Sequence, residues 1–263
     1  MAAACILCQD PLVLDVADDS DTESSVNDPK TIPDDVELPC GDHFHWQCLL
    51  DAYTSPSCPA CSQSITTSTV MPSSSSTSPP TQAEQALVTL TNEGGVQHNL
   101  DILPLLTEEA YLRSHPEDRI CRAFLELCRE GDVSAIVDLL RSCSEPQDDD
   151  EDEDEVPRKS ASQVLRYQDP LGEGQSGLHA AVAASQREVA WLLLLLASEL
   201  PELEFPALVY QEAAHLGVMR PEGQTGEVDI RTLRDSKGRT AEDIAAEVGG
   251  VWHGWVGSGR LSA

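Results

Sequence analysis

The feature that most constrains this chain is a set of paired cysteines and histidines within its first 61 residues. Cys5–Cys8 and Cys58–Cys61 are Cys-x-x-Cys pairs, and His45–Cys48 repeats the same gap. A two-residue gap lets one tight turn present two ligands to one ion, and zinc takes four nitrogen or sulfur ligands in a tetrahedron. A further pair begins at Cys40. Four pairs of ligands therefore predict two Zn²⁺ ions.

The distribution of cysteine favours metal binding over disulfide formation. Six of the nine cysteines lie before residue 62. The N-terminus lacks the basic start and long apolar stretch of a secretory signal. The longest apolar run, 189–197, has nine residues, whereas a membrane-spanning helix needs about 20. We therefore expect a soluble intracellular protein, cytoplasmic and/or nuclear, in whose reducing environment clustered cysteines bind metal.

The charge of the chain restricts its partners. There are 46 acidic residues against 16 basic ones, which gives a formal net charge of −30. A chain of this charge repels nucleic acid and anionic membrane surfaces. We therefore expect no nucleic-acid or membrane partner, and we expect any partner attracted by charge to be a basic protein.

The order of the ligand pairs resembles that of the RING finger family. In that family a Cys-x-x-Cys pair and a long loop precede Cys-x-His-x-x-His-x-x-Cys, and a Cys-Pro-x-Cys pair follows. The resemblance covers residues 5–61 and implies a small zinc-stabilised α+β domain over 1–62, with 9–39 as a long acidic loop. It also implies a cross-braced arrangement in which alternate pairs share an ion. One ion would have the ligands Cys5, Cys8, His45 and Cys48, and the other Cys40, Cys58, Cys61 and one further residue.

The identity of that further ligand is open between two neighbours. The family register places it at Asp42, and a carboxylate can bind zinc. The adjacent imidazole of His43 is the chemically preferred ligand. We favour His43 and keep Asp42 as the alternative.

The resemblance also implies an activity. RING domains mostly act in ubiquitin-protein ligases, where they hold a ubiquitin-conjugating enzyme and perform no covalent chemistry themselves. The residues that match the enzyme-binding groove are Ile6, Leu7 and Pro59. The groove aromatic of the family is replaced by Ala52, and we expect Tyr53, one place later, to contact the partner together with these three residues. Ser62-Gln63 stands where a basic residue usually follows the last ligand.

These matches and departures leave two functions to consider. The first is a RING-type ubiquitin-protein ligase, or a ligase component, that recruits a conjugating enzyme and a protein substrate, with no catalytic residue of its own. The alternative is a non-catalytic zinc-binding scaffold or chaperone that captures a basic protein with its acidic surface.

The remainder of the chain divides by composition. Residues 63–95 begin with a stretch that is almost all Ser, Thr, Pro and Gln, which predicts a linker. Residues 96–263 show helical patterning, interrupted by an acidic insert over 144–160 that contains eight consecutive carboxylates, Asp148–Glu155. Like charges at this density repel one another and remain solvated.

Three segments of the helical region resemble ankyrin repeats, whose signature is Asp-x-x-Gly-x-Thr-Pro-Leu-His-x-Ala followed by a helix rich in Val and Leu. They are Phe124–Leu140, Ser176–Leu194 and Asp235–Ala245. The resemblance implies a short all-α stack that binds protein, in which His179 makes structural hydrogen bonds. The apolar residues of 251–256 would cover its end. A generic all-helical domain is the competing interpretation.

Overall fold

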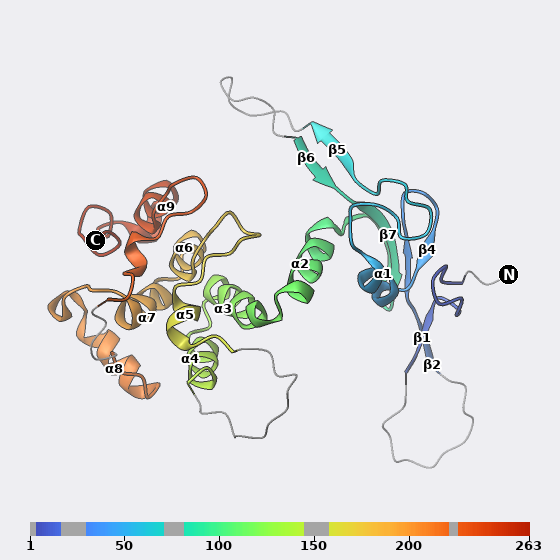
Figure 1. Cartoon of the computed structure of the whole chain (residues 1–263). Helices are drawn as coiled ribbons and strands as arrows, with labels where there is room; N and C mark the ends of the chain where they lie inside the picture. The colour runs from blue at the N-terminus through green and yellow to red at the C-terminus, as the bar shows by residue number, and fades with distance from the viewer. Residues whose placement is uncertain (1–3, 17–29, 71–81, 145–157, 221–225) are drawn as a thin grey trace, which may run out of the picture. The chain divides into compact units, whose positions relative to one another are not determined.

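The computed structural model describes residues 4–16, 30–70, 82–144, 158–220 and 226–263 (Figure 1). The chain divides into two compact units, Met1–Ser114 and His115–Ala263. Strands predominate in the first unit, and the second contains only helices and connecting segments among its described residues. Within the described ranges, no helix has both the length and the apolar character needed to cross a membrane.

The described residues of the first unit form three antiparallel sheets and two helices. Strand β1 (Val13–Val16) pairs with β2 (Lys30–Pro33), and β5 (Thr67–Val70) pairs with β6 (Gln82–Gln85). The central sheet has the strand order β4-β3-β7-β8, formed by His43–Phe44, Asp35–Glu37, Leu87–Asn92 and Gly95–Asp101. Helix α1 (Trp46–Ala52) follows β4, and helix α2 (Leu103–Ser114) follows β8.

The core of this unit forms on one side of the central sheet. Side chains alternate between the two faces of a strand, so Val36 points inward between the outward carboxylates of β3. Val36 pairs with Phe44 of β4 and with Leu90 of β7. Val36 and Phe44 are fully buried together with Leu49 of α1 and Leu106 of α2. This core joins the segment that carries the metal-ligand candidates to strands much later in the chain.

The structure differs from the composition-based division at residues 63–95. Strands β5, β6 and β7 lie within the stretch expected to be a linker. Strand β8 begins at the last residue of that stretch and continues into the expected helical domain, and the unit extends to Ser114. The physical reason is the sequence 87–96. It alternates apolar and polar residues over 88–91. The side chain of Asn92 then accepts a hydrogen bond from the Gly94 N–H at a tight turn. Residues 71–81 of the expected linker lie outside the described ranges.

The expected acidic loop over 9–39 also contributes to this core. Leu12, Val36 and Leu38 from this stretch are buried. The acidic residues of this stretch make it resemble a solvated loop in the sequence. It nevertheless forms short strands, and the inward position of β3 is apolar. Residues 17–29 of the loop lie outside the described ranges.

The second unit consists of helices joined by short turns. Its longer helices are α3 (Arg119–Glu130), α4 (Val133–Ser142), α7 (Arg187–Ala197), α8 (Ala207–His215) and α9 (Ala241–Val248). Shorter ones are α5 (Ala161–Leu165), α6 (Gly177–Ala183), η1 (Pro116–Asp118), η2 (Glu202–Glu204), η3 (Ile230–Thr232) and η4 (Gly250–Trp252). Most of the acidic insert, including Asp148–Glu155, lies outside the described ranges.

Two antiparallel helix pairs share the same kind of turn. Between α3 and α4 the backbone is left-handed at Gly131 (φ 87°), and between α6 and α7 it is left-handed at Ser185 (φ 64°). Helix α6 packs between α3 and α9, so these three helices form a row. Helix α4, which follows α3, contacts α7, which follows α6. A Cβ atom added to Gly177 would lie 2.6 Å from the Phe124 ring. This glycine therefore permits the close approach of α6 to α3.

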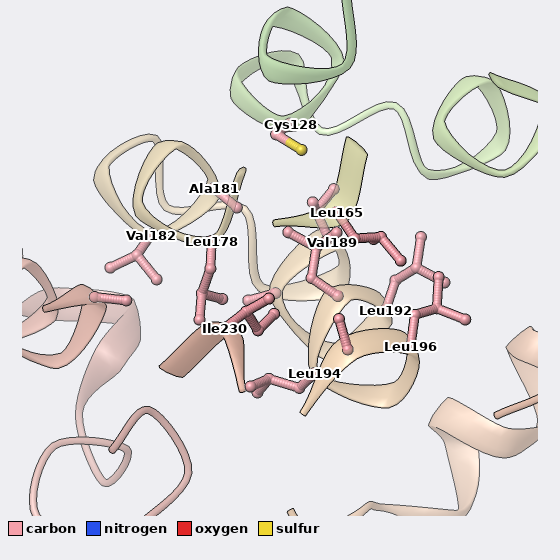
Figure 2. Close-up of a cluster of buried hydrophobic side chains, with 14 of the residues drawn as sticks. Cys128, Leu165, Leu178, Ala181, Val182, Val189, Leu192, Leu194, Leu196 and Ile230 are labelled. Atoms are coloured by element: carbon pink, nitrogen blue, oxygen red, sulfur yellow. The ribbon is translucent and has the colours of Figure 1, made fainter. Parts of the chain in front are cut away.

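The interior of the second unit is a continuous apolar cluster (Figure 2). Helix α7 contributes the largest share because eight of its eleven residues are buried. Leu178 and Val182 of α6 pack with them. Burial of a leucine or valine side chain contributes roughly 1.5–3 kcal/mol each. This cluster is consequently the main source of stability in the unit.

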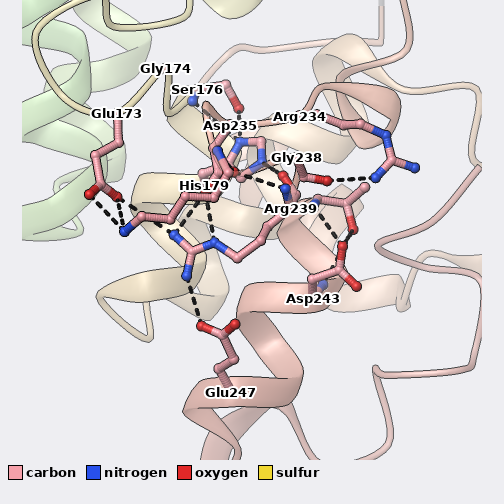
Figure 3. Close-up of polar contacts among 12 residues, drawn as sticks. Glu173, Gly174, Ser176, His179, Arg234, Asp235, Gly238, Arg239, Asp243 and Glu247 are labelled. Atoms are coloured by element: carbon pink, nitrogen blue, oxygen red, sulfur yellow. Dashed lines mark hydrogen bonds and ion pairs between the residues drawn. The ribbon is translucent and has the colours of Figure 1, made fainter. Parts of the chain in front are cut away.

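Two similar polar turns precede the helices α6 and α9 (Figure 3). At the first, the imidazole Nδ1 of His179 lies 2.7 Å from the hydroxyl oxygen of Ser176, and its Nε2 lies 3.1 Å from the carbonyl oxygen of Arg239. At the second, Thr240 and Asp243 form the equivalent capping box. The buried ring of His179 therefore caps its own helix and bridges to the next turn.

The C-terminal residues cover the apolar cluster. Trp252 and Trp255 are almost fully buried. The indole Nε1–H of Trp252 donates to the carbonyl oxygen of Val182 at 2.9 Å, and the Trp255 ring lies 4.4 Å from that of Trp191. Of the apolar residues of 251–256 that were expected to cover the end, Trp252 and Trp255 are buried, whereas Val251 and Val256 are exposed.

We predict that His179→Ala destabilises the second unit by about 2–4 kcal/mol, because it creates a cavity and leaves buried polar groups unpaired. Burial lowers the pKa of His179 below its ordinary value of 6.5. Its contribution to stability is therefore complete above pH 6.5 and falls as the pH drops toward the lowered value. Urea unfolding followed by circular dichroism, at neutral pH and at pH 5, measures both effects.

The matched control for this experiment is His215→Ala, since His215 is exposed on α8. We expect it to change stability by no more than about 0.5 kcal/mol. Equal stability losses in the two variants would contradict the bridging role of His179.

Candidate metal centre

Four ligand atoms from the first and third pairs converge in the first unit. They belong to Cys5, Cys8, His45 and Cys48, and all lie within 4.8 Å of one another. The Nδ1 atom of His45 lies 3.3 Å from the Cys8 sulfur and 3.8 Å from the Cys48 sulfur. A tetrahedron around zinc with these ligand types has edges of about 3.5–3.8 Å. The group therefore has the chemistry and the spacing of a four-coordinate zinc site.

A second group forms from the other two pairs. Its members are Cys40, Asp42, Cys58 and Cys61, whose ligand atoms also lie within 4.8 Å of one another. The Asp42 Oδ2 atom lies 3.4 Å from the Cys40 sulfur and 3.1 Å from the Cys58 sulfur. The Cys61 and Cys58 thiols hold the pKa of Asp42 below its ordinary value. Asp42 consequently presents an anionic oxygen that could bind a metal ion together with the three sulfur atoms.

The structure places His43 outside both groups, contrary to our preference for it as a ligand. Its Nδ1 lies 2.9 Å and 3.1 Å from the two carboxylate oxygens of Asp35. Residues 42 and 43 enter strand β4, where successive side chains point to opposite sides. Asp42 points toward the cysteines, so His43 points toward β3. The open alternative, Asp42, is the residue that the structure brings to the site.

The hydrogen bonding of His45 fixes which ring nitrogen faces the sulfur atoms. Its Nε2 lies 2.9 Å from the carbonyl oxygen of Pro11, an acceptor, so Nε2 carries the proton. The lone pair of Nδ1 is then free for a metal ion. Burial opposes protonation of this ring, but the Pro11 carbonyl and the Cys5 thiol outweigh it and raise the pKa of His45. Binding of an ion must therefore displace a proton at acidic pH.

A buried carboxylate that sequence analysis did not single out supports the same segment. Asp34 accepts a hydrogen bond from the backbone N–H of Trp46, with its two oxygens 3.2 Å and 3.3 Å away. This bond satisfies an otherwise unpaired donor at the start of α1, the helix that carries Cys48. Asp34 is one of many acidic residues in its stretch, and the sequence contains no signal that distinguishes it.

The thiols differ in their acidity. Burial opposes ionisation of Cys5, but backbone N–H groups of Cys8, His45 and Leu7 outweigh it and lower the pKa to about 6. Burial and neighbouring groups raise the pKa of Cys48 and of Cys58 to about 12. A bound divalent ion favours the thiolate form of every cysteine ligand. Metal binding to these groups therefore releases protons.

The four residues expected to contact a partner occupy different environments. Ile6 and Leu7 are exposed beside the first Cys-x-x-Cys turn, at 40% and 41%, and Pro59 is partly exposed. Tyr53 is only 7% exposed and belongs to the core. Helix α2 packs against α1, a long-range contact that the local pattern around Tyr53 does not indicate.

Comparisons of the chain with protein-family profiles, curated protein sequences and solved structures give no match. The assignment of the site therefore depends on its own residues. These form two groups of sulfur, nitrogen and carboxylate ligands that can each hold a metal ion, in agreement with two zinc ions.

We predict that the purified protein contains two zinc ions per chain, measured by elemental analysis. Asp42→Ala and Cys58→Ser should each lose one ion, because a three-ligand site binds zinc much more weakly. His43→Ala should retain both. Retention of both ions by Asp42→Ala with loss of one by His43→Ala would refute the ligand set described above.

Proposed function

We propose that this chain is a RING-type ubiquitin-protein ligase, or a component of one, that functions in the cytoplasm and/or nucleus. The observation that carries the proposal is the interleaving of the ligand pairs. The first and third pairs form one group, and the second and fourth form the other. A RING cross-brace requires this alternation, whereas two separate zinc fingers would use consecutive pairs.

In this proposal the zinc unit positions another enzyme and performs no covalent step. Four protein ligands close each site, which is typical of structural zinc. The ions would hold the Cys-x-x-Cys turns so that Ile6, Leu7 and Pro59 form the surface for a ubiquitin-conjugating enzyme. Holding the charged ubiquitin near a substrate lysine raises the rate through proximity.

We propose further that the second unit is a short, degenerate ankyrin stack that binds the protein substrate. Three features support this interpretation: the row α3, α6 and α9, the left-handed turns at Gly131 and Ser185, and the bridging ring of His179. In ankyrin stacks such turns join the two helices of a repeat and connect it to the next.

The ligase proposal predicts the behaviour of Leu7→Ala. In a ubiquitination assay with a panel of conjugating enzymes, the wild-type chain should build polyubiquitin, and Leu7→Ala should reduce the rate at least about tenfold while retaining zinc. Val96→Ala is the control because Val96 is also exposed in this unit but lies on β8. Cys5→Ser should abolish activity. The absence of chains with every enzyme in the panel would exclude the proposal.

A second candidate function follows from the departures from the RING pattern. Tyr53 is buried, Ala52 stands at the aromatic position, and Ser62-Gln63 replaces the basic residue. These features together with the net charge of −30 favour a non-catalytic zinc-binding scaffold or chaperone that captures a basic protein. The acidic tract Asp148–Glu155 is the segment with the highest charge density.

The scaffold candidate predicts salt-sensitive binding of basic proteins that depends on this tract. Removal of 148–155 should weaken binding of a lysine-rich probe such as histone H1 at least about tenfold at 50 mM salt, with a smaller difference at 300 mM salt. Replacement of the same residues by Ser and Gly serves as a length-matched control. Unchanged binding in both variants would exclude the tract as the capture site.

A further inference from the structure

A groove of about 600 Å³ lies between α7 and α8 on the second unit. Its α7 wall is formed by Arg187, Glu188, Trp191, Leu192 and Leu195. These positions follow the spacing i, i+1, i+4, i+5 and i+8, which places them on one face of a helix. The floor is apolar because Leu192 and Leu195 are buried.

The α8 wall repeats this pattern. It includes Leu208, Val209, Glu212, Ala213 and Leu216, which have the same relative spacing. Two matching stripes of side chains therefore face one another without closing the space between them. The volume is within the range of binding pockets, roughly 300–1,000 Å³.

Helix α8 is held at both ends, which keeps the groove open along its middle. Just before its start, the buried Phe205 ring lies 5.6 Å from Trp191. At its end, the Arg141 guanidinium donates to the carbonyl oxygen of Leu216 at 3.1 Å. Between these attachments Ala213 is the one fully buried residue of α8, and Leu208 is 74% exposed.

The charged groups of the groove favour a cationic ligand. Glu188 and Glu212 are exposed on opposite walls. The guanidinium of Arg187 lies over the Trp255 ring, 5.4 Å from its centroid, so this positive charge interacts with the C-terminal segment of the chain. Further carboxylates, Glu202 and Glu204, lie exposed in the η2 segment before α8.

Two occupants from this chain itself are disfavoured. The segments outside the described ranges contain no Leu, Ile, Phe or Trp, and two of them are strongly acidic. They cannot supply an apolar stripe, and the acidic segments would meet carboxylates. A second copy of the chain would bring another net charge of −30 to the same surface, and this repulsion opposes self-association.

We propose that the groove between α7 and α8 binds an amphipathic helical segment of a partner protein, apolar on one face and basic on the other. The apolar face enters between Trp191, Leu192 and Leu208, and the basic residues reach Glu188 and Glu212. Binding of an amphipathic helix in an apolar groove is a common mode of peptide recognition. This inference rests on the proposed function, which gives the second unit a protein-binding role. It deepens that proposal by naming the surface that binds the partner.

The test uses the full chain and a fluorescein-labelled 18-residue peptide made of Leu and Lys at helical spacing. Its counterpart has Glu in place of every Lys. Fluorescence anisotropy should show binding of the Leu–Lys peptide only. Leu208→Asp should weaken this binding at least about tenfold, and Glu212→Lys at least about threefold with reduced salt dependence.

Two matched controls separate the groove from the rest of the acidic surface. Leu203→Asp alters a residue that is 99% exposed but does not line the groove, and Glu130→Lys reverses a charge on α3. Both should bind the peptide within twofold of wild type. Circular dichroism melts should show that all four variants fold, since the altered side chains are exposed.

Three outcomes would overturn the inference. They are equal weakening by Leu203→Asp and Leu208→Asp, binding of the Leu–Glu peptide as tightly as the Leu–Lys peptide, and failure of the Leu–Lys peptide to bind. Concentration-dependent dimerisation that Leu208→Asp abolishes, seen by sedimentation, would instead assign the groove to a second copy. The ligase assay is independent of all these readouts, so polyubiquitin formation without peptide binding would reject the groove and retain the ligase.

Discussion

The convergence of eight side chains on two points is the constraint that organises the first unit. Each group must bring its ligand atoms within 4.8 Å of one another, although its members come from segments up to 43 residues apart in the first group and 21 in the second. Since successive ligand pairs belong to different groups, the chain must pass from one group to the other between each pair and the next. The carbonyl of Pro11 orients His45, and Asp34 secures the start of α1. Residues that are not ligands therefore determine the positions of those that are.

Local patterns predicted the parts of this site that depend on spacing. Seven of the ligand candidates and the expectation of two ions follow from short gaps, because a tight turn fixes the relation of two nearby side chains. The choice between Asp42 and His43 required knowledge of where strand β4 begins, because the side chains of these two residues point apart as the chain enters that strand. The burial of Tyr53 and the pairing of β3 with β7 depend on contacts between distant segments. A single sequence carries no direct signal for such contacts.

The helical unit shows how capping and packing are combined. Ser176 and Thr240 both begin helices with a capping box, a feature visible in the sequence. In addition, the contact of the His179 imidazole with the Arg239 carbonyl connects the turn before α6 to the turn before α9. Helical patterning was expected over 96–263 as a whole, but the attachment of α8 at its two ends with an open middle was not expected. That arrangement depends on Phe205, which lies just before α8, and on Arg141 of α4, which is distant from α8 in the sequence.

The pairing of β3 with β7 has a consequence for the smallest fragment that can exist alone. A chain ending at residue 62 would retain every ligand candidate but would lose β7, β8 and α2. Val36 and Phe44 would lose the cover of Val88 and Leu106, and β3 would present an unpaired edge. Exposed edges of this kind promote aggregation. The compact unit that contains the ligand candidates is thus nearly twice as long as their pattern indicates. Inactivity of a fragment shortened to residue 62 would therefore reflect its insolubility and give no information about the activity of the whole unit.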